Sequence, residues 1–145
     1  MITGEAEILK NLDKAQVNIS QAIDEAVVDV AHQVRSLAVK SIQEVSNGHT
    51  SVRYSQGGNP YNHVVSAAGD APNTDTGKLA SSIGVQHKKG SGEAYVSTDD
   101  KKAPHLEFGT INMEPRPFLG PALEQKEDLL PDAISNAVKR QLGKI

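Results

Sequence analysis

The sequence predicts an α+β fold in which a long N-terminal helix and a C-terminal helix pack on a small antiparallel sheet. Three observations support this prediction. Apolar residues recur every three or four positions near both ends of the chain, as on the buried face of a helix. Between these stretches, apolar and polar residues alternate around a glycine-containing turn, which is typical of a β-hairpin. A long polar loop separates the first helix from the sheet, and we expect a single domain over residues 1–145.

The first helix is predicted over residues 5–46, a stretch without Pro or Gly, and Asn47-Gly48 supplies a C-terminal stop. Unbroken, this helix would be roughly 60 Å long, whereas a compact domain of this size is roughly 40 Å across. The helix would then overhang its own domain, and a second chain would have to cover its apolar stripe. The alternative is a break near Asn18 or Asp24, which would give two shorter helices in one monomer.

Residues 48–76 are rich in Gly, Asn, Ser and Pro, and most of this segment is predicted to be loop. Residues 52–54 and 63–66 are the parts that could form short strands. Loops longer than about 12–15 residues are usually functional or disordered. Two interpretations stay open here: an arm that becomes ordered against a neighbouring molecule, or a plain mobile loop.

Residues 77–118 are predicted to form a hairpin followed by an extended segment. Thr76 is expected to cap a short helical turn over residues 77–82. The two strands are expected over residues 83–88 and 93–98.

The rest of the chain is predicted to be mainly helical. A brief helix over residues 103–109 should end at its glycine, and two prolines keep residues 113–118 extended. The C-terminal helix is expected over residues 119–143, and Pro131 should kink it or split it in two.

The composition excludes several classes of protein. The net charge of −3 gives no overall attraction to DNA or to an anionic membrane. The absence of cysteine excludes disulfides and thiolate chemistry and fits assembly in a reducing cytoplasm. No apolar run approaches the roughly 20 residues that span a bilayer, and the first residues lack the apolar stretch of a secretory signal.

No residue pattern indicates catalysis or a cofactor. The five histidines lack the spacing of a zinc-binding helix. The sequence Asp75-Thr76-Gly77-Lys78 lacks the upstream glycine and the following Ser or Thr of a phosphate-binding loop. Asp99, Asp100 and Glu107 could hold a metal ion, but a solvated turn is the favoured interpretation. We therefore expect no enzyme, no metal and no cofactor.

A small cluster of cations lies near the end of the chain, at Lys139, Arg140 and Lys144. Cations there complement the dipole of the last helix, and we favour this explanation over contact with DNA.

Four motifs occur in order between residues 71 and 124. The first is Asp75-Thr76-Gly77-Lys78-Leu79 with Ser82-Ile83 shortly after it, and the second is the strand that ends in YVST at residues 95–98. The others are APHLEFGT at residues 103–110 and MEPRPFLGPAL at residues 113–123. This order resembles the tail-completion, or head–tail joining, family of long-tailed (siphovirus-type) bacteriophages. Pro104 departs from the usual pattern, in which a tyrosine–alanine pair precedes the Glu-Phe-Gly element.

The resemblance implies a non-enzymatic virion protein that forms a ring, expected to be a hexamer, between the phage head and tail. It implies as partners further copies of the chain, the head-connector or stopper protein, and a tail terminator or tail-tube protein. DNA would pass through the lumen of the ring with only passive contact. The protein would be found in the virion, and in the host cytoplasm during assembly.

Two rival functions stay open. One is a tail terminator or tail-tube-like subunit, which belongs to the same class of ring-forming phage proteins. The other is a dimeric DNA-binding or host-interacting adaptor, in which the long helices would pair as a coiled coil. The apolar stripe drifts around the helix, which argues against a long coiled coil.

The candidate interface and structural residues come from these motifs. Two prolines fix the backbone around Arg116, and a rigidly held guanidinium suits a bidentate pair with Glu107, within one subunit or between two. Phe108 and Phe118 are expected to pack the brief helix and the final helix onto the sheet. Ordinary scaffolding within one chain is the alternative for these four residues. The complete set of candidates is Asp75, Lys78, Leu79, Glu107, Phe108, Arg116, Pro117 and Phe118.

Overall fold

The computed structural model describes residues 4–144 and confirms the predicted α+β class. The helices are α1 (Glu5–Gln43), α2 (Lys78–Ser82), α3 (Ala103–Phe108), α4 (Leu119–Glu127) and α5 (Leu129–Leu142). The strands are β1 (Thr50–Tyr54), β2 (Pro60–Val64), β3 (Gly84–Lys88) and β4 (Glu93–Ser97).

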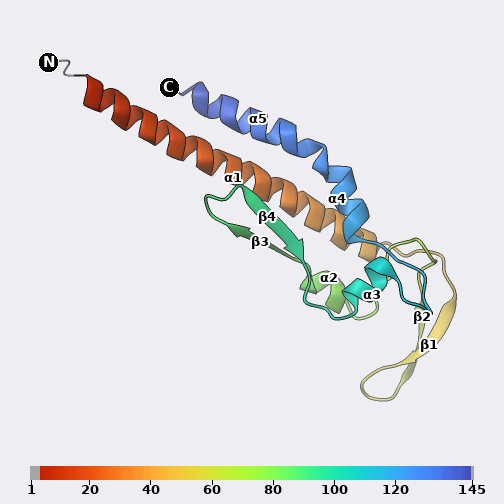
Figure 1. Cartoon of the computed structure of the whole chain (residues 1–145). Helices are drawn as coiled ribbons and strands as arrows, with labels where there is room; N and C mark the ends of the chain where they lie inside the picture. The colour runs from red at the N-terminus through yellow and green to blue at the C-terminus, as the bar shows by residue number, and fades with distance from the viewer. Residues whose placement is uncertain (1–3, 145) are drawn as a thin grey trace.

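Helix α1 is the longest element, and the other elements are arranged around its C-terminal half. Figure 1 shows α4 and α5 running back along α1 in the opposite direction, while the β3–β4 hairpin lies on another side of it. The β1–β2 hairpin projects from the far end of the molecule, beyond the C-terminal end of α1. We call this β1–β2 hairpin, residues 50–64, the arm hairpin. The sheet expected as one unit is therefore two separate antiparallel hairpins.

Helix α1 is unbroken over 39 residues, so the alternative with a break near Asn18 or Asp24 is wrong. It ends at Gln43, three residues before the predicted end, because residues of the following loop form hydrogen bonds with main-chain groups at and just beyond its C-terminal end. The amide of Thr74 donates to the carbonyl oxygen of Ile42 at 3.0 Å. After Gln43 the backbone becomes extended at Glu44. The Asn73 side chain then accepts a hydrogen bond from the amide of Ser46 at 2.7 Å.

The segment over residues 48–76 contains more regular structure than expected. Its strands pair in register from Thr50 opposite Val64 to Tyr54 opposite Pro60. Each strand differs from its predicted range, since the polar side chains of this segment give no clear alternation. Most of residues 48–76 is loop, as predicted, and the possible strands are present with shifted bounds and paired with each other.

The short helices show which capping predictions hold. Thr76 does not cap α2, because the N-cap position is Gly77. Gly77 has a φ of 72°, which favours glycine, and its amide donates to Thr74 Oγ1 at 3.1 Å. Gly109, with φ of 75°, ends α3 as predicted. The C-terminal helix is split as expected, but the division falls at Asp128. Pro131 then lies in the first turn of α5, where a missing amide costs nothing.

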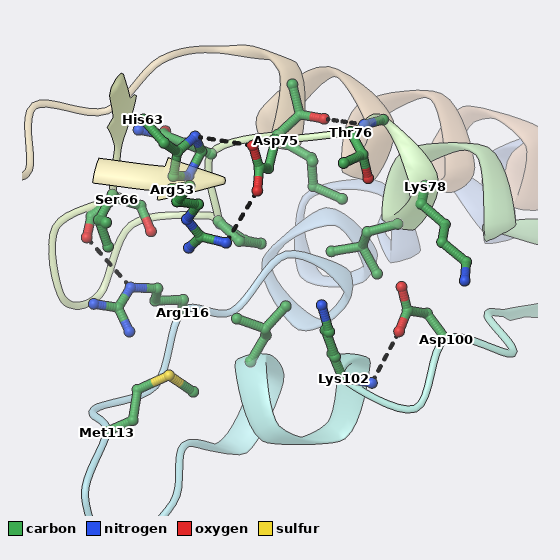
Figure 2. A pocket seen from close by; sticks show the side chains of 18 residues that line it. Arg53, His63, Ser66, Asp75, Thr76, Lys78, Asp100, Lys102, Met113 and Arg116 are labelled. Atoms are coloured by element: carbon green, nitrogen blue, oxygen red, sulfur yellow. Dashed lines mark hydrogen bonds and ion pairs between the residues drawn. The ribbon is translucent and has the colours of Figure 1, made fainter. Parts of the chain in front are cut away.

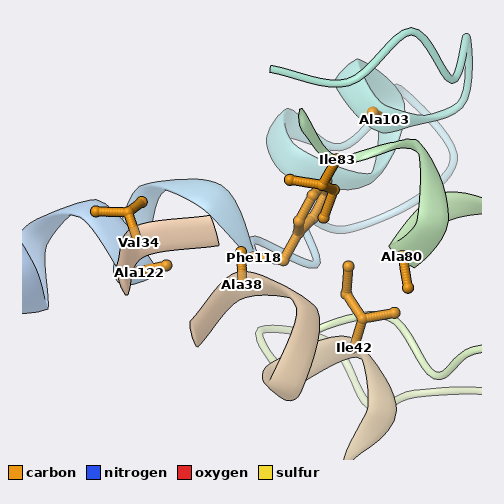
Figure 3. Close-up of a cluster of buried hydrophobic side chains, with 8 residues drawn as sticks. All are labelled: Val34, Ala38, Ile42, Ala80, Ile83, Ala103, Phe118 and Ala122. Atoms are coloured by element: carbon orange, nitrogen blue, oxygen red, sulfur yellow. The ribbon is translucent and has the colours of Figure 1, made fainter. Parts of the chain in front are cut away.

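The main core lies where the C-terminal half of α1 meets α2, α3 and α4. Phe118, Ile42 and Ile83 are each about 1% exposed, and Figure 3 shows Phe118 and Ile83 side by side next to α1. A second, smaller cluster joins α1 to α5 through Ala22, Ala26 and Ala137. The remaining members of the main core are Val34, Ala38, Ala80, Ala103 and Ala122.

Candidate functional site: protein-binding surfaces

Glu107 lies on α3, and its carboxylate binds the start of α4. Oε2 accepts hydrogen bonds from the amides of Phe118 and Leu119 at 2.9 and 3.0 Å. Oε1 accepts the amide of Gly120 at 2.7 Å. The first amides of a helix have no partner inside it, and a negative charge is favourable at this end. Glu107 therefore fixes α4 to α3.

Arg116 lies in the extended segment between α3 and α4, and it contacts main-chain atoms. Its amide donates to the carbonyl oxygen of Leu106 at 2.6 Å, and its Nε donates to that of Ser66 at 3.3 Å. None of the ion pairs among residues 4–144 joins Arg116 to Glu107, so the predicted pair does not form inside one subunit, where the Glu107 carboxylate binds three amides instead. A pair between two subunits stays a prediction. Pro117, half-buried, follows Arg116 and leads into the core.

The two phenylalanines have opposite environments. Phe118 is buried in the main core as an anchor, but it packs among residues of α1, α2, α3 and α4 and Ile83, and not on the sheet as predicted. Phe108 is 80% exposed, so its predicted role as an intrachain anchor is wrong. Helix α3 packs through Ala103 and Leu106 instead, and these residues lie on another face of the helix. An exposed aromatic side chain of this size is a common feature of protein-binding surfaces.

Asp75 fastens the arm hairpin to the body of the protein. Its Oδ2 accepts a hydrogen bond from Arg53 at 3.0 Å, and its Oδ1 accepts one from the Tyr61 hydroxyl at 2.7 Å. His63 Nδ1 lies 3.6 Å from the same Oδ1. The hydrogen bond to Asp75 raises the pKa of Tyr61 above its usual value. Side chains from both strands of the arm thus converge on one carboxylate, as Figure 2 shows for Arg53 and His63.

A cavity of about 280 Å³ lies beside this cluster and brings several charged side chains together. Lys78 lines it from the first turn of α2, with Asp100 and Lys102 nearby (Figure 2). Leu79, the next motif residue, packs against the main core. The motif that begins at Asp75 therefore has three separate roles: fastening the arm, lining the cavity and filling the core.

An apolar groove of about 880 Å³ lies between β4, α3 and α4, and we call it the β4 groove. Its floor is the face of α1 that carries Val27, Val30, Ala31 and Val34, and one wall is residues 94–97 of β4. Three large side chains at its edge are exposed: Tyr95 by 58%, Phe108 by 80% and Leu123 by 51%. An apolar hollow with exposed aromatic residues at its edge is suited to binding another protein.

The N-terminal part of α1 is a second exposed apolar surface. No residue between Glu5 and Gln21 is buried. Ile8, Leu9 and Leu12 are each about 60% exposed on one side of the helix. In Figure 1 this part of α1 extends past the end of α5.

Asp24 is a structural residue that the sequence analysis did not single out. It is 8% exposed, and its carboxylate accepts the amides of Gly90 and Gly92 in the turn between β3 and β4, the second at 2.8 Å. These hydrogen bonds lower the pKa of Asp24. The available signal was an acidic residue within the apolar stripe of the first helix, followed much later by a Lys-Gly-Ser-Gly turn.

Residues 4–144 contain neither a membrane-spanning helix nor a metal-binding cluster. No helix there is long and apolar enough to cross a membrane. No group of three or more His, Asp or Glu side chains in the same residues could hold a metal ion.

The family model described as "Bacteriophage HK97-gp10, putative tail-component" matches residues 6–109, which is more than half of the chain. The chain belongs to the HK97-gp10-like family. The match runs from α1 to Gly109 and thus includes the arm hairpin, Asp75 and Glu107. It confirms the resemblance to siphovirus tail proteins and identifies the HK97-gp10-like chain as a structural component of a phage tail. No curated protein and no solved structure matches it.

Proposed function

We propose that this tail component forms a ring, with six subunits expected, that joins the head connector of a phage to its tail. The observation that carries the proposal is the exposed apolar stripe on the N-terminal part of α1. A stretch of 17 residues, from Glu5 to Gln21, contains no buried side chain, and at about 1.5 Å per residue it is roughly 25 Å long.

A helix in this position needs a partner. Most helical stability in proteins comes from packing of an apolar face, and this part of α1 has no such buried face within residues 4–144. Ile8, Leu9 and Leu12 provide such a face, and contact with a second chain would bury it. This supports an assembled subunit.

The charge of the chain supports the expected relation to DNA. A net charge of −3 gives no general attraction to phosphate groups. DNA therefore passes the ring with passive contact, and the partners are the head-connector or stopper protein and the tail terminator or tail-tube protein. The protein is located in the virion at the head–tail junction.

The test is the native mass of the purified protein at several concentrations, followed by a copy-number measurement on tails isolated from particles. We expect a discrete ring, six copies per particle, in at least the isolated tails. A stable dimer that binds duplex DNA with strong salt dependence would overturn the proposal in favour of the adaptor. Labelled subunits located by electron microscopy at a site away from the head–tail junction would also contradict it.

A further inference from the structure

We propose that the arm hairpin of one subunit binds in the β4 groove of the next subunit. The inference rests on the proposed ring, since it names the contact that links neighbouring copies. The two faces of the arm hairpin differ in polarity. Because side chains alternate along a strand, Arg53, Tyr61 and His63 share one face, and this face is fastened to Asp75.

The opposite face of the arm exposes apolar side chains beside the polar Thr50 and Asn62. It carries Val52, exposed by 60%, and Tyr54, exposed by 70%, with Pro60 directly across from Tyr54. Because the polar face contacts Asp75 of the same subunit, this second face is left exposed on a hairpin that projects from the end of the molecule (Figure 1). The arm thus supplies a compact apolar projection.

Several contacts hold the arm in one orientation before any partner arrives. Asn73 Nδ2 donates to the carbonyl oxygens of Ser46 and Val64 at 3.0 and 2.9 Å, which ties the base of the arm to the end of α1. Gly48 lies so close to the main chain of Val65 that no side chain would fit there. Because the arm is ordered in advance, less conformational entropy is lost when it binds.

The β4 groove offers the matching site. Four consecutive residues of β4, 94–97, line it, so the groove follows the edge of that strand. Within residues 4–144, these four residues make no main-chain hydrogen bond outside the β3–β4 pair. A free strand edge beside an apolar hollow can accept another strand through main-chain hydrogen bonds, while the hollow accepts its alternate side chains.

Charge favours the arm as the occupant. Residues 50–64 contain one arginine, one histidine and no acidic residue. The groove is lined by Asp99, Asp100 and Glu107 against a single cation, Lys101. The N-terminal part of α1 is the other exposed apolar segment of the chain, but residues 5–16 carry three acidic residues and two lysines. Arg53 and His63 are paired with Asp75, so what the arm offers an acidic groove is the absence of negative charge, and this makes it the electrostatically better match.

The placement of the two surfaces fits a ring. The arm hairpin lies beyond the C-terminal end of α1, whereas the groove lies over the middle of that helix (Figure 1). Two complementary surfaces at different places on one subunit give a head-to-tail contact, and such contacts close into a ring when the rotation allows it.

The chain contains no cysteine, so the contact can be tested by site-specific disulfide crosslinking. Subunits carrying Tyr54→Cys are mixed with subunits carrying Leu123→Cys, which lies at the groove edge. The matched control replaces the second partner by Leu142→Cys, an exposed leucine at the end of α5. Each variant is first checked for wild-type helical content. The crosslinking is performed on the assembled ring or, where the free subunit is monomeric, on tails isolated from particles.

We expect a covalent dimer from the Tyr54→Cys and Leu123→Cys mixture and at least tenfold less from the control mixture. Equal yields from both mixtures would overturn the arm-in-groove contact. A second variant, Val52→Glu with Tyr54→Glu, should release subunits from the ring, whereas Gln56→Glu at the arm tip should not. A normal ring from the double variant would reject this inference and leave the ring standing. Failure of the wild-type chain to form any ring, free or in tails, would reject the proposed function itself.

Discussion

The carboxylate of Glu107 shows how one residue can join two elements. Its three hydrogen bonds reach the amides of residues 118–120, which lie more than ten positions further along the chain. Gly120 allows this approach, because a Cβ there would lie 3.0 Å from Glu107 Oε1. The start of α4 and the position of Phe118 in the core thus depend on one side chain.

Replacing Glu107 with Ala should lower the free energy of unfolding by roughly 1–3 kcal/mol, because three helix-terminal amides lose a charged acceptor. Glu107→Gln keeps one carbonyl oxygen and should cause a smaller loss. The measurement is urea denaturation followed by circular dichroism. Glu124→Ala, an exposed glutamate on α4, is the control. A change within about 0.5 kcal/mol for Glu107→Ala, the usual range for surface substitutions, would contradict the capping role.

The long helix and the β3–β4 hairpin are joined by Asp24, which binds the amides of the hairpin turn. This joint fixes the hairpin along α1 and so shapes the β4 groove, whose floor and wall these two elements form. Its stability depends on the charge of Asp24.

Because the pKa of Asp24 lies below its ordinary value of 3.8, the carboxylate contributes stability above that value. This contribution should disappear as the pH falls through the lowered pKa of the folded state. Asp24→Asn should therefore be less stable than wild type at pH 7, and the difference should shrink in acid below about pH 4. Denaturant unfolding of both proteins at pH 7 and in acid measures this difference in the free energy of unfolding. Asp29→Asn, exposed on the same helix, is the control, and an equal loss from both variants would argue against the joint.

The elements differ in how far the sequence predicted them. Apolar residues at helical spacing predicted α1, and alternation predicted the β3–β4 hairpin, although α1 is buried only from Ala22 onward and alternate residues of β4 are only half-buried. For the arm hairpin, residues 52–54 and 63–66 were recognised as possible strands, but their pairing was not predicted, since these residues are almost all exposed and pair through main-chain groups and Asp75. For the candidate site, too, the sequence did not show which of the motif residues are buried. Phe108 and Phe118 occur in similarly specific motifs, but only the packing of α3 decides that one is exposed and the other buried.

For the whole molecule, the central feature is how little of its N-terminal part is buried. The main core gathers around the C-terminal half of α1, and the first buried residue of that helix is Ala22. The N-terminal part can therefore be altered without disturbing the core, which separates effects on assembly from effects on folding.

Replacing both Ile8 and Leu12 with Asp should weaken assembly while leaving the thermal unfolding of the subunit unchanged. We expect at least a tenfold rise in the concentration needed for assembly, equivalent to about 1.4 kcal/mol per contact, because two apolar side chains no longer leave water. Light scattering over a concentration series measures this. The control is Val17→Asp, which places one such charge on the opposite side of the helix. If Val17→Asp weakened assembly as much as the double variant, this apolar stripe would not be an interface.

The fastening of the arm hairpin also makes it sensitive to ionic strength. Arg53 and Asp75 are partly open to solvent, with side chains exposed by 44% and 22%. Dissolved ions screen such a pair, over a distance of about 8 Å at physiological salt and about 3 Å at 1 M. The main core contains no charge and does not respond in this way. Concentrated salt therefore weakens the fastening of the arm while the hydrogen bonds of Tyr61 and Asn73 and the body of the subunit persist, so the arm becomes easier to displace without any unfolding.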